Sequence, residues 1–145
     1  MVKILSAKEL RAKIAAEEGR KASAALAAHA AAEAEKEAML EKMRRPSGLS
    51  DEEVIEKASI IVNRAVENGQ THVQVYRFPH TLCTDNGRAI NQAEVGWEQT
   101  LTGVPKEIHE FWKRQLKDRG YHIRCEILSY PGGMPGDIGM ILSWE

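Results

Sequence analysis

The chain has 145 residues, 43% of them hydrophobic, which is the size of one domain with an appendage. Its formal net charge of −1 disfavours a general nucleic-acid binder, because such domains are usually strongly basic. No apolar run reaches the ~18 residues that a membrane-spanning helix needs. Residues 1–10 turn charged too early for a secretory signal peptide. Two cysteines do not make a disulfide framework, so we expect a cytoplasmic protein.

Residues 6–45 are predicted to form one long helix. Ser6 followed by Glu9 is a capping box, and 14 of the 32 residues in 7–38 are alanine, the strongest helix former. Large apolar residues are sparse and a regular heptad series is not sustained, so we predict no long coiled coil. Two i,i+4 pairs nevertheless give each end an apolar patch. The candidate association residues are Leu10, Ile14, Leu26, Met39, Leu40 and Met43.

A linker follows this helix. Pro46 disfavours helix at the residue before it, and Gly48 adds a second break. The predicted organisation is therefore a helical arm at 1–45, a linker at 46–49 and a compact domain at 50–145.

The compact domain is predicted to have the element order α-β-α-β-β. Residues 50–68 and 104–119 have apolar positions at helical spacing, and three other segments alternate apolar and polar residues with the period of a strand. The fold class is therefore α+β. We expect a three-stranded, mainly antiparallel sheet that is covered on one face by two helices and preceded by the long N-terminal helix.

The predicted strands are residues 71–78, 121–130 and 138–144, the last two joined by a glycine- and proline-rich turn at 131–137. Residues 80–103 are the least regular part, with short helical turns expected near 81–85 and 97–101. Alternation also predicts which side chains face away from the helices. These are His72, Gln74, Tyr76, Phe78, His122, Arg124, Glu126, Ile141 and Ser143.

Two kinds of ligand site follow from this arrangement. Small sheets with exposed aromatic residues can stack single-stranded bases, which makes His72, Tyr76, His122 and Arg124 candidate binding residues, although no RNP1-like run is present. The turn at 131–137 could expose backbone N–H groups to an anion or nucleotide, with Arg88 adding charge. A phosphate loop normally leads into a helix, however, whereas this turn leads into a strand.

The candidates for metal binding or catalysis are the two H-x-x-C pairs, His80/Cys83 and His122/Cys125. Residues three apart on a strand point to opposite faces, so His122 and Cys125 cannot hold one ion, and we predict no metal site and no cofactor. A nucleophilic Cys83 would need a base such as His80 and a lowered pKa. No catalytic motif accompanies the pair, so an enzyme that uses Cys83 and His80 is kept only as an alternative.

Three stretches together resemble a group of short, uncharacterised bacterial proteins, mainly proteobacterial. They are R-F-P-H-T-L-C-T-D-N-G-R-A-I-N at 77–91, W-E-Q-T-L-T-G at 97–103 and P-G-G-M-P-G-D-I-G at 131–139. The resemblance covers about residues 49–144. It implies a bacterial, cytoplasmic protein and no catalytic residues, and it directs attention to Asp85, Gly87, Arg88 and Asn91. We expect the Arg88 guanidinium to tie the irregular segment to the 131–137 turn, or to bind the 81–85 segment.

Elimination leaves protein association as the predicted function. The expected protein is non-enzymatic and uses its helical arm and small α+β domain for interaction or self-assembly. A homodimer through the arm is expected, and a helix of a partner protein in the same place is the alternative. Neither a membrane nor nucleic acid is the expected partner.

Overall fold

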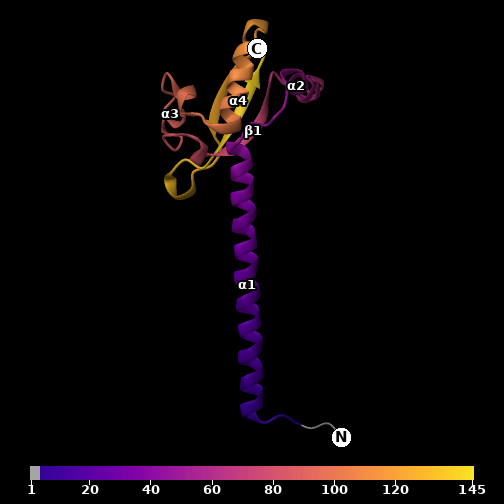
Figure 1. The fold of residues 1–145 in the computed structure, drawn as a ribbon, viewed down its shortest axis with the longest axis vertical. Helices are drawn as coiled ribbons and strands as arrows, with labels where there is room; N and C mark the ends of the chain where they lie inside the picture. Colours follow the sequence, from indigo (N-terminus) through magenta and orange to yellow (C-terminus); the bar gives the residue numbers. More distant parts are fainter. Residues whose placement is uncertain (1–3) are drawn as a thin grey trace. The chain divides into compact units, whose positions relative to one another are not determined.

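The computed structural model describes residues 4–145 and divides into two compact units, with the boundary between Glu41 and Lys42. The first unit contains most of α1 (Ala7–Arg44), an uninterrupted helix whose last three residues belong to the second unit (Figure 1). Ser6 begins it as predicted, because its hydroxyl accepts a hydrogen bond of 3.2 Å from the backbone N–H of Glu9. No side chain of α1 is buried, so the helix depends on its alanine-rich propensity within the chain.

The second unit is an α+β domain with a three-stranded antiparallel sheet, as predicted. The strand order is β1-β3-β2, so the last strand lies in the middle. Its helices and strands are α2 (Asp51–Glu67), β1 (His72–Pro79), α3 (Arg88–Asn91), α4 (Gly103–Phe111), β2 (His122–Ile127) and β3 (Asp137–Ser143). Figure 1 shows α2 and α3 on either side of α4.

The core of this unit lies between β3 and the elements that cover one face of the sheet. Ile138, Met140 and Leu142 of β3 are almost completely buried on that face, and Phe111 of α4 is buried with them. At 0% exposure, Ile138 and Met140 mark the centre of the core. Burial on this scale is the main stabilising contribution to a domain of this size.

Strand β1 contains a bulge that the alternation of its sequence does not reveal. The register shifts between Gln74 and Tyr76, so Val75 is the extra residue. Tyr76 then pairs with Met140, and Phe78 pairs with Ile138. Both aromatic side chains therefore face the helices, and the prediction that they face outward is wrong.

The segment between β1 and α4 is well packed. It contains the 3-10 turns His80–Leu82 and Trp97–Thr100, close to the two predicted turns, and also the unpredicted α3. An isolated β-bridge between Cys83 and Leu101 closes the segment. A Cβ at Gly87 would lie 3.3 Å from Cδ1 of Ile138, so the segment covers the Ile138 end of the helix-facing side of the sheet. Its buried apolar residues are Leu82, Cys83, Ala89, Ile90 and Leu101.

The helical run predicted at 104–119 is present but is not one regular helix. After α4 the chain continues as a π-helical segment at Trp112–Leu116 and a 3-10 turn at Lys117–Arg119, and then ends at Gly120 with φ 90°. The Trp112 indole N–H donates a hydrogen bond of 3.0 Å to the carbonyl of Tyr121, which fixes the ring at the start of the π-helical segment. Gly120 has the left-handed conformation typical of a helix C-terminal cap.

Candidate functional site

A cavity of about 350 Å³ lies within the compact domain between α2, α4 and the sheet. Val75, Ile123 and Leu142, one from each strand, form its floor, and Ala58 and Ile61 of α2 line one wall. The opposite wall comes from α4 and the π-helical segment and includes Val104, Ile108, Phe111, Trp112 and Leu116. Native interiors leave few voids larger than a water molecule, so a space of this size and apolar character is the leading candidate site.

Helix α2 covers this cavity without filling it. Ser50 caps the start of α2, and its hydroxyl accepts a hydrogen bond of 3.2 Å from the backbone N–H of Glu53. Of its apolar residues only Ala65 is buried, whereas Val54, Ala58 and Ile61 are half-buried. The middle of α2 therefore packs incompletely against the rest of the domain.

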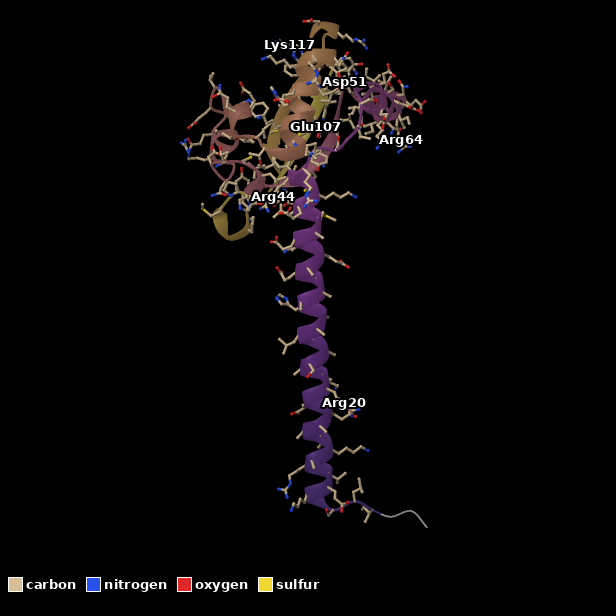
Figure 2. All side chains as sticks on the ribbon, in the orientation of Figure 1. Arg20, Arg44, Asp51, Arg64, Glu107 and Lys117 are labelled. Carbon is tan, nitrogen blue, oxygen red and sulfur yellow. The ribbon has the colours of Figure 1, made fainter. Side chains whose placement is uncertain are left out.

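Polar side chains join the elements at the rim of the cavity. Asp51 lies at the start of α2 (Figure 2). It accepts hydrogen bonds from Arg114 at 2.9 and 3.4 Å and from Gln115 at 2.9 Å. These bonds, Arg114 first, lower the pKa of the Asp51 carboxyl. On α4, the Glu107 carboxylate accepts bonds from the backbone N–H of Ser47 at 3.1 Å and from its hydroxyl at 2.7 Å. The start of α2 and the linker before it are therefore fastened to the opposite wall.

Tyr76 is the polar residue of the cavity floor. The β1 bulge turns it inward, and its ring stacks on Phe78 with 6.3 Å between ring centroids. Burial raises the pKa of its hydroxyl, and the nearby Glu107 carboxylate raises it further. The hydroxyl therefore stays protonated well above neutral pH and can donate a hydrogen bond.

The outer face of the sheet carries the other predicted binding residues. His72 and His122 both pair with Ser143, and Arg124 pairs with Ile141, so the three side chains share this face as predicted. Arg124 bonds Glu126 on the same strand at 2.8 Å. Tyr76 and Phe78, which were also expected on this face, point toward the helices instead. The predicted base-stacking platform therefore lacks its aromatic ring.

The candidate binding residues Asp85, Arg88 and Asn91 do not form one site. The guanidinium of Arg88 pairs with Glu94 at 3.1 Å, and both side chains are exposed. The prediction that Arg88 binds the 131–137 turn or the 81–85 segment is therefore wrong. Asp85 accepts bonds from the backbone N–H groups of Gly87 and Ala89 and begins α3.

Asn91 supplies the cross-tie that we expected from Arg88. Its side-chain oxygen accepts a hydrogen bond of 2.7 Å from the hydroxyl of Tyr130, and the backbone N–H of His80 donates to the carbonyl of Gly136 at 3.2 Å. The sequence predicted a bond between these two segments but assigned it to the charged Arg88. A neutral pair carries no charge pattern that would identify it.

Of the two thiols, Cys83 is buried and Cys125 is half-buried. Burial raises the pKa of Cys83 to about 11 and that of Cys125 to about 12. The thiolate is the nucleophilic form, so a thiol with such a pKa is almost entirely unreactive at neutral pH. The backbone N–H of Cys83 bonds the carbonyl of His80 at 2.9 Å, which is a turn contact.

The register confirms the geometric argument about the second H-x-x-C pair. His122 pairs with Ser143 on the outer face, whereas Cys125 pairs with Met140 on the helix-facing side. Within residues 4–145, no three His, Cys, Asp or Glu side chains cluster in a way that could hold a metal ion. Over the same residues, no helix combines the length and apolar character needed to cross a membrane.

Sequence reasoning missed the cavity, and the available signals were weak. Ala58 interrupts the large apolar residues of α2 with a small one, which leaves room beneath the helix. The run V-Q-V-Y-R-F in β1 alternates well enough to conceal the bulge that brings Tyr76 inward. The sequence of residues 112–116 contains no feature that predicts a π-helical segment.

No protein-family model, curated protein or solved structure matches this chain.

Proposed function

We propose that this is a non-enzymatic association protein and that α1 joins two copies into a homodimer. The observation that carries this proposal is that α1 has 38 residues and no buried side chain. Most helices in proteins are held by an apolar face that packs on something. Leu10, Ile14 and Met39 are 45%, 57% and 62% exposed, which leaves their apolar surface available to a second helix.

Four of the six large apolar residues of α1 follow one straight stripe. Met39 follows Leu10 by 29 residues, which is close to eight turns of 3.6 residues. The other small or apolar members at matching intervals are Ile14, Ala25, Ala28 and Ala32. Alanines let two helices approach closely, so the apolar patches at the ends can both be reached by a single partner helix. Leu26, also an expected association residue, lies about a third of a turn away from this stripe.

Charge favours an antiparallel pair over a parallel one. The stripe is interrupted by three charged residues that lie on the same side of the helix: Glu18, Lys21 and Lys36. In a parallel pair in register each of them would face its own copy, which places like charges together. In an antiparallel pair in which Leu10 and Ile14 face the partner's Met43 and Met39, Glu18 lies close to the partner's Lys36.

Sedimentation of the full chain tests this arrangement. Ile14→Lys should weaken the dimer, whereas Leu26→Lys, which adds the same charge at a more exposed position off the stripe, should not. Glu18→Lys should also weaken it, and Glu18→Lys combined with Lys36→Glu should restore it, because the pair is then exchanged between helices. A wild-type chain that remains monomeric at high micromolar concentration would show that α1 does not self-associate.

The adaptor alternative makes a different prediction. If α1 binds a helix of another protein, the chain alone should be monomeric and the four variants should sediment alike. A monomeric chain would therefore redirect the search toward a partner that Ile14→Lys no longer binds and Leu26→Lys still does.

A further inference from the structure

The cavity between α2 and α4 is separate from the proposed association surface, and it is the strongest remaining feature of the molecule. We propose that it binds a small, uncharged, mainly apolar molecule with one hydrogen-bonding group, such as a bicyclic aromatic alcohol. The proposal rests on three observations: how the cavity is kept open, what lines it, and the irregular helix that forms one wall.

Polar bonds at the rim set the spacing of the two helical walls. Asp51 at the start of α2 is held by Arg114 and Gln115, and Ser47 in the linker is held by Glu107. At the other end of α2, Ala65 is 3% exposed and so fixes that end in the core. The helix is thus fastened near both ends, while the residue in the middle of its inner face is the small Ala58. A cavity held in this way cannot be closed by sliding α2 inward without breaking the rim bonds.

The lining determines the class of ligand. The interior surface comes from aliphatic and aromatic side chains, and two of the charged groups at the rim, Asp51 and Arg114, are paired with each other. The other charged lining residues are Lys57, which is exposed, and Glu107, whose carboxylate is bonded to Ser47. An ion placed among the apolar side chains would lose its hydration, which is costly. The Tyr76 hydroxyl is the polar group of the floor, so one donor or acceptor on the ligand can be matched there.

The size of the cavity narrows the class further. A buried cavity of about 150 Å³ lined by Leu, Ile and Phe binds benzene. The volume here is about 350 Å³, so a molecule of two fused rings or a comparable branched aliphatic group has room. The aromatic rings of Tyr76, Phe111 and Trp112 line the space and favour a flat aromatic ligand.

The wall opposite α2 contains a structural irregularity at the same place. The helix changes to π-helical geometry at Trp112–Leu116, and Trp112, Arg114 and Leu116 from this segment line the cavity. Such segments are rare and occur frequently at functional sites, because the wider turn redirects side chains. Here Trp112, the first residue of this segment, lines the cavity while its indole N–H bonds the carbonyl of Tyr121.

Calorimetric titration of the full chain with 2-naphthol tests the proposal. We expect saturable binding of one molecule per chain. Ala58→Leu fills the cavity and should abolish binding, and Ala58→Met, which is more flexible, should do the same if Ala58→Leu does not fold. The matched control is Ser59→Leu, which adds the same side chain at the next, exposed position of α2 and should bind as the wild type does.

A second pair of probes tests the role of Tyr76. Tyr76→Phe should weaken 2-naphthol about two- to tenfold, the range of one neutral hydrogen bond, and leave naphthalene unchanged. The anion 2-naphthoate should bind at least tenfold more weakly than 2-naphthol.

Three outcomes would overturn the proposal. The first is no saturable binding of 2-naphthol to the wild type, and the second is equal binding by Ala58→Leu, Ser59→Leu and the wild type. The third is a change of oligomeric state in Ala58→Leu alone, which would make the cavity a contact between copies of this chain. Because Ala58 is not on α1, Ile14→Lys should leave 2-naphthol binding intact, so failure of this proposal is distinguishable from failure of the dimer.

Discussion

The hydroxyl of Tyr130 donates a hydrogen bond of 2.7 Å to the side-chain oxygen of Asn91 and so joins the loop after β2 to α3. The two residues are 39 positions apart, and the bond connects two segments that are otherwise rich in turns. Each segment loses conformational entropy on folding, so a long-range tie between them has to offset part of that loss.

Removing this hydroxyl should lower the free energy of unfolding. Tyr130→Phe is expected to cost roughly 0.5–1 kcal/mol, because the bond is neutral and Tyr130 is 54% exposed. Denaturant unfolding of Tyr130→Phe, Asn91→Ala and the double variant measures the pairwise coupling. Strictly additive effects of the two substitutions would show that the bond contributes nothing to stability.

Gly136 is expected to be the glycine of this loop least tolerant of substitution. A Cβ there would overlap the Ser129 hydroxyl and lie 2.7 Å from Cδ of Pro131. Gly136→Ala should therefore lower the free energy of unfolding by about 2–3 kcal/mol, as overpacking does. Gly133→Ala is the matched control, since Gly133 has open space and only a φ of +81°, and it should cost about 1–2 kcal/mol. Equal midpoints for the two variants in urea would contradict this ranking.

Much of the fold follows from local sequence signals. Capping serines mark the starts of α1 and α2, and alternation marks β2 and β3, whose outer and inner side chains fall as predicted. These elements are predictable because the capping residue or the alternating pattern that identifies each of them lies within or next to the element itself. The strand order also follows the simplest connection, with the closing hairpin pairing β2 and β3.

The features missed by sequence reasoning depend on contacts between distant segments. The bulge leaves Val75 of β1 unpaired, but it allows Phe78 to be buried beneath the helices. Alternation of apolar and polar residues does not show which of these two effects is larger. The pairing of Arg88 with Glu94 instead of the hairpin turn depends on where α3 ends. The candidate cavity also depends on contacts between distant segments, because the bulge brings Tyr76 inward and the spacing of α2 leaves the room.

The two thiols should resist modification in the native protein. With pKa values near 11 and 12, Cys83 and Cys125 remain protonated at pH 8, and both are partly or fully buried. We expect a thiol-specific colorimetric reagent to react slowly with the native chain and rapidly with two thiols per chain in guanidinium. Ala27→Cys, which places a thiol on exposed α1, should add one rapid reaction. Rapid reaction of the native wild type would revive the alternative in which Cys83 acts as a nucleophile.

His109 should make the compact domain less stable in mild acid. Its ring lies between Trp97 and Trp112, with centroids 5.6 and 5.3 Å away, and burial is the main cause that lowers its pKa below 6.5. Glu98 and Glu110 oppose this shift, while Lys113 and Lys117 add to it. Because the unfolded chain binds the proton more readily, stability is fully present above about pH 6.5 and falls as the pH drops from there through the lower native pKa.

Thermal unfolding measured from pH 7.5 to pH 5 checks this sign. His109→Gln should flatten the decline, whereas His29→Gln on α1 should leave it unchanged. Protonation of His109 should also alter the fluorescence of the two flanking tryptophans, with a midpoint below pH 6.5 that disappears in His109→Gln. The Asp51 pairing does not interfere, because that carboxyl has a lowered pKa and loses its charge only below its ordinary value of 3.8. A decline that persists unchanged in His109→Gln would assign the acid sensitivity to another group.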